Sequence, residues 1–244
     1  MTEDWRFRPA RDLGLTPGDR LRAVGREPGL GGLVIGVAWR GLVRFYLRVV
    51  HRLRVTGLEH LPPPPFVVVA NHSSHLDALT ILTALPRHLA RRTYALAAGD
   101  TFFKSVPAAM FAAYAVNALP VWRKKTSARD LEGMRARLLE DGAVLVLFPE
   151  GTRTRTGIMG RFQPGVGALV TGRDVPVVPM HLTGAYEAWP STSRLPRPGR
   201  LALRVGAPLR FEDVAVGRAG LMAVAEACEA AVRALAPPPA DLRP

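Results

Sequence analysis

Apolar residues are concentrated in short runs that are separated by polar, proline and glycine residues. The runs at 66–70 (FVVVA) and 144–148 (VLVLF) are rich in branched side chains, which is typical of strands that are buried on both faces of a sheet. Weaker runs of the same kind occur at 94–98, 119–122 and 175–179. The pattern therefore predicts a series of short, buried strands from residue 66 onward.

Helical spacing alternates with these runs. Residues 77–85 form a plausible helix, and Leu131, Met134 and Leu138 repeat at helical spacing up to a stop near Gly142. Near the end, residues 221–235 read as another helix. Strands that alternate with helices predict an α/β fold with a largely parallel central sheet and helices on both faces.

An earlier segment, residues 31–54, shows a different pattern. Arg40, Arg44, Arg48 and Arg52 occur at every fourth position, while aromatic and aliphatic residues fill the other positions. On a helix this spacing gathers the arginines into one stripe. We expect an amphipathic helix that lies on an anionic membrane surface, with apolar groups at the acyl boundary and guanidinium groups among the headgroups. The alternative is an ordinary surface helix packed on the core.

These patterns divide the chain into four segments. Residues 1–30 are a basic lead, expected to be loosely ordered and to form no core, and residues 31–56 contain the amphipathic helix. Consecutive prolines at 62–65 cannot continue a helix, so the main α/β domain is assigned to 57–236. The proline-rich residues 237–244 are expected to be a disordered tail.

The net charge of the chain indicates which classes of partner it could bind. The formal net charge of the 244 residues is +13, so the surface should attract anions such as phospholipid headgroups, phosphorylated substrates or nucleic acid. Cys228 is the one cysteine, which excludes an intramolecular disulfide and a cysteine-rich metal site.

The first residues lack the apolar stretch of a secretory signal, and the longest early apolar run is about half of a bilayer span. We expect no bilayer-crossing topology.

The first candidate for chemistry directly follows the strand at 66–70. His72 lies in the segment Asn71-His-Ser-Ser-His-Leu-Asp77, at the carboxyl end of a strand, where ligand sites of α/β folds are concentrated. If a turn separates them, the Asp77 carboxylate can accept a hydrogen bond from one ring nitrogen of His72 and leave the other as a base. Alternatively, Ser74 and Asp77 form only a helix capping box. Zinc binding by His72 and His75 is disfavoured, since no further histidine or cysteine lies nearby.

The second candidate, residues 148–153 (FPEGTR), follows the strand at 144–148. Gly151 permits close backbone approach, Thr152 offers a hydroxyl, and Arg153 offers a planar set of donors that matches a phosphate. Glu150 could accept a hydrogen bond from a substrate hydroxyl. Taken alone, the segment also fits a surface turn followed by a solvated arginine.

Together the two segments resemble the phospholipid and glycerol-phosphate acyltransferase family. Its members share an Asn-His-four residues-Asp motif, matched by Asn71, His72 and Asp77, and a Phe-Pro-Glu-Gly-Thr-Arg motif, matched by 148–153 including Pro149. Neither segment departs from the family motif that it matches. The resemblance extends over about residues 57–209.

Two other family features are matched less closely. Arg123, after a short apolar strand, can represent the family's intermediate arginine, but Trp122 stands where an acidic residue often precedes it. Past the later motif the family often shows Phe-Lys-x-Gly, whereas this chain has Gln163 in place of the lysine. The final proline-containing strand motif is matched by residues 175–179.

The resemblance implies a glycerol-phosphate acyltransferase-like fold and transfer of a fatty acyl group from an acyl-CoA or acyl-carrier-protein thioester to a lysophospholipid hydroxyl. Lysophosphatidic acid, which would become phosphatidic acid, is the favoured acceptor. His72 would be the base and Asp77 its orienting group, Arg123 and Arg153 would bind phosphate, and Glu150 and Gly151 would shape the glycerol site. The implied enzyme needs no cofactor or metal besides its thioester co-substrate and works as a peripheral protein on the cytoplasmic face of the cell membrane.

Three alternatives stay open from the sequence. The acceptor could be another lysolipid or lipidated molecule. A nucleic-acid-binding protein would explain the net charge, but no zinc finger, helix-turn-helix or RNA-recognition motif is present, so we expect no nucleic-acid partner. A non-catalytic lipid-binding relative would retain the same surface without the reaction.

Overall fold

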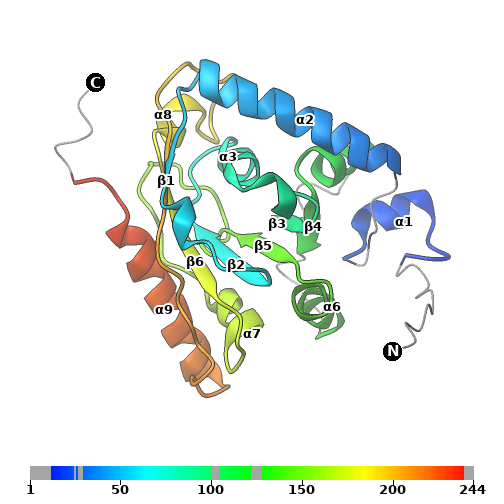
Figure 1. Ribbon diagram of the computed structural model, residues 1–244, viewed down its shortest axis with the longest axis vertical. Coiled ribbons are helices and arrows are strands. Elements are labelled where there is room, and N and C mark those ends of the chain that lie inside the picture. Colours follow the sequence, from blue (N-terminus) through cyan, green and yellow to red (C-terminus); the bar gives the residue numbers. More distant parts are fainter. Residues whose placement is uncertain (1–11, 25, 27–29, 100–104, 122–127, 239–244) are drawn as a thin grey trace.

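The computed structural model describes residues 12–24, 26, 30–99, 105–121 and 128–238 (Figure 1). Its strands are β1 (Arg54–Thr56), β2 (Phe66–Ala70), β3 (Thr93–Ala98), β4 (Ala118–Val121), β5 (Val144–Leu147), β6 (Val177–Thr183) and β7 (Ala202–Val205). Its helices are α1 (Pro17–Arg22), α2 (Leu30–Val49), α3 (Asp77–Ala84), α5 (Val106–Met110), α6 (Ala128–Leu139), α7 (Gly167–Val170), α8 (Ala185–Ala188) and α9 (Arg218–Ala234). Four short helical turns are η1 (Leu58–His60), η2 (Arg87–Leu89), the π-helical η3 (Phe111–Ala115) and η4 (Pro164–Val166).

The seven strands form one sheet in the order β1-β7-β6-β2-β5-β3-β4. All neighbours run parallel except β6 and β7, which pair antiparallel. Because β2 and β5 are parallel neighbours, their carboxyl ends lie at the same edge of the sheet. The sheet therefore brings the two predicted motif loops together, and the predicted largely parallel α/β fold is confirmed.

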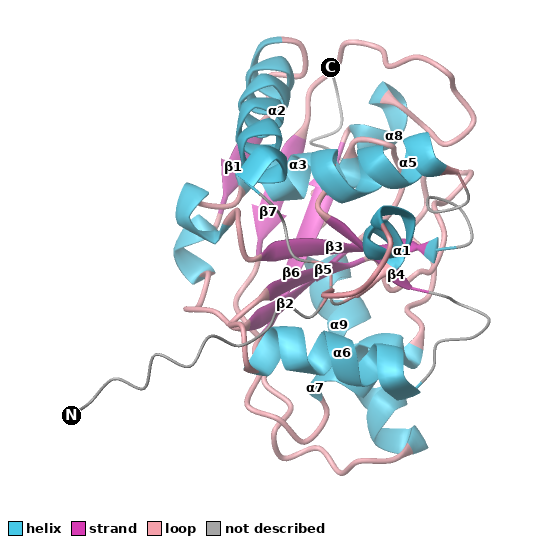
Figure 2. Cartoon of the chain, turned by 90° about the vertical axis from the view of Figure 1, so that its right-hand side faces the viewer, coloured by secondary structure: helices cyan, strands magenta, loops and turns pink. Residues whose placement is uncertain are grey.

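Helices cover both faces of the sheet, as Figures 1 and 2 show from two directions. Along β2, Phe66, Val68 and Ala70 join the core beneath α2 and α3, whereas Val67 and Val69 join the core that contains residues of α6, α7 and α9. Every residue of β2 is fully buried. This explains why the strand is a continuous apolar run rather than an alternating one.

Helix α2 is shorter than expected, and two of its arginines are bound to the domain. It ends at Val49, and residues 54–56 form strand β1, which pairs with β7, so the prediction of helix to about residue 54 is wrong there. Arg40 donates to the Ala90 carbonyl, and Arg44 donates to the carbonyls of Thr83 and Leu85.

These carbonyls lie at and beyond the end of α3, where helix carbonyls lack partners of their own. Two arginines of the stripe are therefore bound to the domain rather than directed wholly outward. The outward face of α2 is apolar, with side chains that are 57–70% exposed: Val34, Ile35, Val37, Leu42, Phe45 and Val49. The opposite face buries Val43 and Leu47 in the core.

The lead segment is more ordered than predicted where the structure describes it. Residues 17–22 form α1, and Leu21 packs against the alanines of α5 and η3. The buried Arg26 guanidinium donates to the carbonyls of Ala113 and Ala118 and to the Asn117 side chain. The expectation that the lead forms no core is wrong for this part. Leu21 belongs to a buried apolar cluster, and the buried Arg26 is held by three acceptors.

The remaining segment predictions have mixed outcomes. The tail prediction falls mostly on residues 239–244, which lie outside the described residues, while 237 and 238 follow α9 without regular structure. Within the described ranges, no helix is both long enough and apolar enough to cross a bilayer.

Candidate active site

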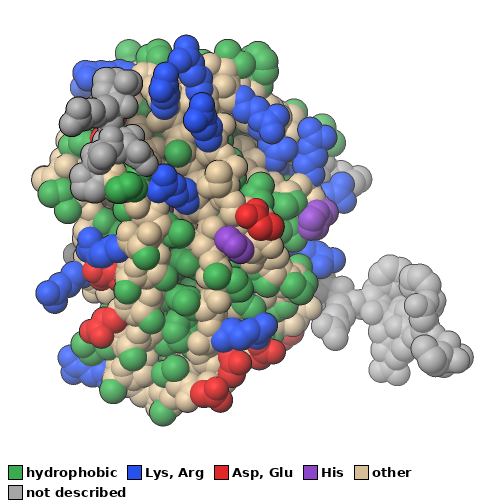
Figure 3. All heavy atoms as spheres, turned by 60° about the vertical axis from the view of Figure 1, so that its left-hand side comes forward, with side chains coloured by type: hydrophobic (Ala, Val, Ile, Leu, Met, Phe, Trp, Pro, Cys, Tyr) green, Lys and Arg blue, Asp and Glu red, His purple; other side chains and the backbone are tan. Residues whose placement is uncertain are grey.

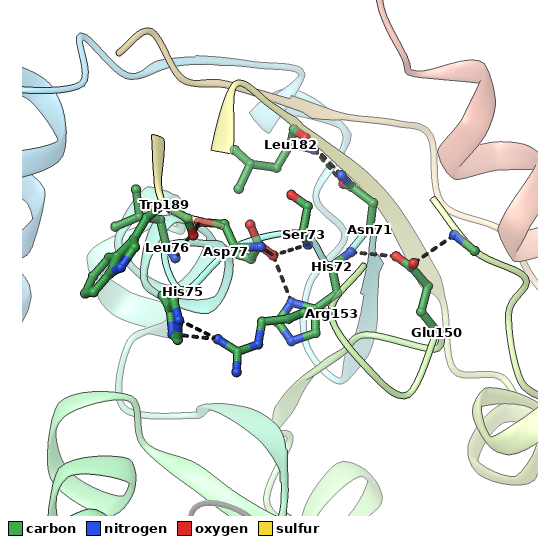
Figure 4. A network of polar contacts seen from close by, with 12 residues as sticks. Asn71, His72, Ser73, His75, Leu76, Asp77, Glu150, Arg153, Leu182 and Trp189 are labelled. Carbon is green, nitrogen blue, oxygen red and sulfur yellow. Dashed lines mark hydrogen bonds and ion pairs between the residues drawn. The ribbon is translucent and has the colours of Figure 1, made fainter. Parts of the chain in front are cut away.

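His72 and Asp77 meet in the loop between β2 and α3. The Nδ1 atom of His72 lies 2.8 Å from Oδ2 of the fully buried Asp77 (Figure 4). The same oxygen accepts the backbone N–H groups of Ser73 at 2.6 Å and Ser74 at 2.7 Å. Because this oxygen acts as an acceptor, Nδ1 of His72 is the donor in their contact, and Nε2 is left as the accepting ring nitrogen.

The capping alternative and the base alternative are thus compatible. Asp77 is the first residue of α3 and binds the N–H of Ser74, as a capping carboxylate does, while also holding the imidazole. The Ser74 hydroxyl accepts from the N–H of Leu76 and donates to the Trp189 carbonyl. The turn between His72 and Asp77 is therefore built by several mutually supporting hydrogen bonds.

Asn71 fixes the loop to the sheet. Its side-chain amide donates to the Leu182 carbonyl at 2.9 Å and accepts from the Leu182 N–H at 2.8 Å. The amide thereby continues the pairing of β2 with β6 by one residue beyond the strand. The asparagine next to the histidine therefore has a structural role: it holds the start of the loop in place.

Glu150 ties the second loop to the first. Its Oε1 accepts the backbone N–H of His72 at 2.6 Å, and its Oε2 accepts that of Gly160 at 2.8 Å. Burial raises the pKa of this carboxyl, and the two backbone hydrogen bonds oppose that rise. The structure thus gives Glu150 a positioning role, while its predicted contact with a substrate hydroxyl stays a prediction.

Two more contacts join the loops at His72. The ring of Phe148 stacks on the imidazole with 4.1 Å between centroids and 19° between planes. The backbone N–H of Thr154 donates to the His72 carbonyl at 2.9 Å. The sequence signal for Phe148 was its place in the later motif, but its action on the histidine depends on the strand order.

Arg153 reaches across to the first loop. Its Nη1 lies 2.5 Å from Nδ1 and 3.0 Å from Nε2 of His75, as Figure 4 shows. Burial lowers the pKa of the guanidinium, while Asp77 opposes this shift.

Gly151 has a backbone φ of 74°, a left-handed conformation that glycine adopts without strain. Arg123 lies outside the described residues.

A cavity of about 440 Å³ connects these groups. One part is lined by His72, His75, Thr152 and Arg153, together with Pro149 and Gly151. Most of the other lining residues are apolar and come from β3, β4, η3 and the end of β5, among them Ala97, Phe111, Ala112, Val121 and Leu147. The geometry combines an oriented imidazole and a cation with an apolar chamber. In the part of the chain that the structure describes, no three histidine, cysteine or acidic side chains are grouped as metal ligands.

Comparison with known proteins shows the family of this chain. A family model described as Acyltransferase matches residues 52–183. The 1-acyl-sn-glycerol-3-phosphate acyltransferase alpha of Ovis aries is 31% identical over 169 residues, which are 67% of this chain and 56% of that protein. The 1-acyl-sn-glycerol-3-phosphate acyltransferase of Pseudomonas aeruginosa is 28% identical over 182 residues, which are 71% of this chain and 66% of that protein.

A solved structure has the same fold. It is the 1-acyl-sn-glycerophosphate (LPA) acyltransferase PlsC from Thermotoga maritima, with a TM-score of 0.63 and 21% identity over 86% of this chain and 84% of that chain. The family model covers more than half of the chain, and the chain therefore belongs to the acyltransferase family. It spans 56% of the length of the Ovis aries relative.

Proposed function

We propose that this protein transfers a fatty acyl group from an acyl-CoA or acyl-carrier-protein thioester to the free hydroxyl of a lysophospholipid. The favoured acceptor is lysophosphatidic acid, and the product is phosphatidic acid for phospholipid biosynthesis. The observation that carries the proposal is the 2.8 Å pairing of His72 with the buried Asp77 at the wall of a largely apolar cavity. The printed names of the two relatives above support lysophosphatidic acid as the acceptor.

In this proposal His72 acts as the general base. Nε2 removes the proton of the acceptor hydroxyl while the oxygen attacks the thioester carbonyl, and the ionised Asp77 stabilises the resulting imidazolium. The tetrahedral intermediate then collapses, the carbon–sulfur bond breaks, and the thiolate leaves with the proton from the imidazolium. An ester and a free thiol are formed, and no acyl-enzyme is required.

The second loop binds the acceptor in the same proposal. Arg153 pairs with the phosphate, and Arg123 is assigned the same role from the resemblance. Thr152 and the backbone of Gly151 line the cavity beside His72 and suit the glycerol part. The apolar chamber suits a fatty acyl chain, because burying methylene groups there is favourable.

We further propose that α2 docks the enzyme as a peripheral protein on the cytoplasmic face of an anionic membrane. Its outward apolar face continues to η3, since Trp39 packs edge-on against the half-exposed Phe111, which also lines the cavity. Burial lowers the pKa of Arg44, and the nearby charges of Arg48 and Arg87 lower it further. Figure 3 shows basic side chains gathered on the upper part of the molecule, where α2 lies in Figure 1. An apolar helix face flanked by cations suits such a surface.

A panel of acceptors tests the reaction. Purified protein is incubated with acyl-CoA or acyl-carrier protein and with lysophosphatidic acid, other lysophospholipids or glycerol 3-phosphate, and the products are identified by mass spectrometry. Phosphatidic acid formation with a thioester donor is expected. Transfer only to another lysolipid would replace the acceptor, and ester formation by none of them would contradict the proposal.

The membrane proposal has its own test. Leu42→Ser with Phe45→Ser removes two exposed apolar groups without touching Val43 and Leu47 in the core. We expect binding to anionic vesicles to fall at least about tenfold. Met222→Ser on α9, the opposite face of the domain, is the matched control. Unchanged flotation of the double variant would remove the role of α2.

A further inference from the structure

His75 lies within reach of the same phosphate-binding arginine. It is partly buried, lines the cavity, and rests against the Trp189 ring with 4.9 Å between centroids. Its backbone N–H donates to the Trp189 carbonyl, so the backbone and the ring are both held. The edge of the imidazole faces Nη1 of Arg153 at 2.5–3.0 Å.

The contact with Arg153 requires a neutral imidazole. A guanidinium group only donates hydrogen bonds, so a ring nitrogen of His75 must accept. In agreement, burial lowers the pKa of His75, and the charge of Arg153 lowers it further. In this state Nη1 of Arg153 is hydrogen-bonded to the imidazole of His75 at the wall of the cavity.

A phosphate group changes this balance. A phosphate dianion has several acceptor oxygens and can take a donor from Arg153 and another from a protonated imidazole at the same time. Gln163, which also lines the cavity, is uncharged and cannot provide the second cation. The imidazole of His75 is next to the guanidinium and can provide it.

We propose that His75 is a second phosphate ligand of the acceptor site, and that it takes up a proton when a phosphate monoester binds between it and Arg153. This inference rests on the proposed acceptor and names the group that recognises its phosphate. The site therefore prefers a phosphate monoester to a phosphodiester, because the dianion compensates two adjacent cations and a monoanion compensates one.

The charged neighbours of His75 come from two loops. Arg153, from the loop after β5, and His72 on its own loop oppose its protonation, whereas Asp77 favours it. The Oδ2 atom of Asp77 already accepts hydrogen bonds from three donors. The Trp189 ring, which contacts the His75 ring, carries no charge. A bound phosphate is thus the strongest new influence on the protonation of His75.

Protonation on binding predicts a pH dependence with a definite sign. Above the pKa of free His75 and below its raised pKa in the complex, binding consumes a proton, so the KM for the acceptor rises with pH. The catalytic constant also rises with pH over the acidic range, because a general base must be unprotonated to accept the hydroxyl proton. Raising the pH therefore weakens acceptor binding but favours turnover. The two histidines are therefore separated by analysing KM and kcat apart.

The kinetic test compares His75→Gln with the wild type on lysophosphatidic acid. The KM for this acceptor is expected to rise about tenfold, the loss of one charge-assisted hydrogen bond, with little change in kcat. His75→Lys, a permanent cation, should restore a low KM and remove the part of its pH dependence that is due to the imidazole. Titration of the acceptor phosphate itself, near pH ~6, is common to all variants. His88→Gln, at an exposed position of the η2 turn, is the control.

A binding test separates this inference from the proposed reaction. Histidine-labelled protein is titrated by NMR with and without glycerol 3-phosphate, and the His75 signals are assigned by their loss in His75→Gln. The pKa of His75 is expected to rise with the ligand. An unchanged pKa, or an equal KM for wild type and His75→Gln, would overturn the inference even if acyl transfer is observed. A raised pKa without acyl transfer would keep the phosphate site and contradict the proposed reaction.

Discussion

The loop after β2 and the loop after β5 meet in one site, but their polar groups are held to different degrees. In the first loop, Asn71, Ser74 and Asp77 are each bound to the backbone of the domain. In the second loop, Glu150 is also bound to the backbone, by the N–H groups of His72 and Gly160, but Thr152 is exposed and Arg153 reaches across to a single side chain. A base must be placed accurately to be effective, whereas a flexible cation can adapt to a ligand, so the proposed division of labour follows from the contacts.

Removing the base is the strongest test of this division. His72→Ala should lower kcat by roughly 10²–10⁴-fold, as expected for the loss of a positioned general base. Steady-state kinetics gives the effect, and circular dichroism shows whether the fold is retained. His88→Ala, at an exposed position, serves as the control. Nearly normal turnover by the His72 variant would break the contrast between the loops.

Removing the cation should act on binding instead. Arg153→Ala is expected to raise the KM for a phosphorylated acceptor by roughly 10–100-fold, because a charge-assisted hydrogen bond is lost. The kcat at saturating acceptor should change far less. Kinetics with each substrate varied in turn checks this. An effect confined to the thioester donor would show that the arginine serves the other substrate.

Weakening the link between the loops should affect the base through its backbone. Glu150→Gln keeps an acceptor for the His72 N–H, but its amide meets the Gly160 N–H, and we expect kcat to fall about tenfold. Because burial raises the pKa of Glu150, the wild-type carboxyl protonates at a higher pH than an ordinary glutamate. The ratio of wild-type to variant kcat should therefore narrow as the pH falls. A constant ratio across the acidic range would contradict this link.

The smallest change concerns a hydroxyl that lines the cavity. Thr152→Ala should raise the acceptor KM about two- to fivefold, the effect of one neutral hydrogen bond. Thr152→Ser, which keeps the hydroxyl, should behave like the wild type. If the alanine variant changes kcat and leaves KM unaltered, Thr152 belongs with the catalytic loop.

Much of the sheet follows from local pattern. The runs at 66–70 and 144–148 are strands because branched apolar side chains fit a sheet that is covered on both faces. Strands β1 and β7 were not predicted: each is three or four residues long and contains an arginine, so neither has a continuous apolar run. Their pairing at the edge of the sheet, rather than their composition, makes them strands.

The sequence by itself determined the composition of the two motifs, the strands that precede them and the resemblance to one family. It could not decide which groups touch, because His72 and Glu150 meet only through the parallel pairing of β2 and β5. Nor could it decide which side of α2 faces out, since periodicity defines faces and the packing partner chooses between them. The carbonyls at and beyond the end of α3 bind Arg40 and Arg44, and the apolar face of α2 is left exposed, an outcome that is decided only when the helices pack together.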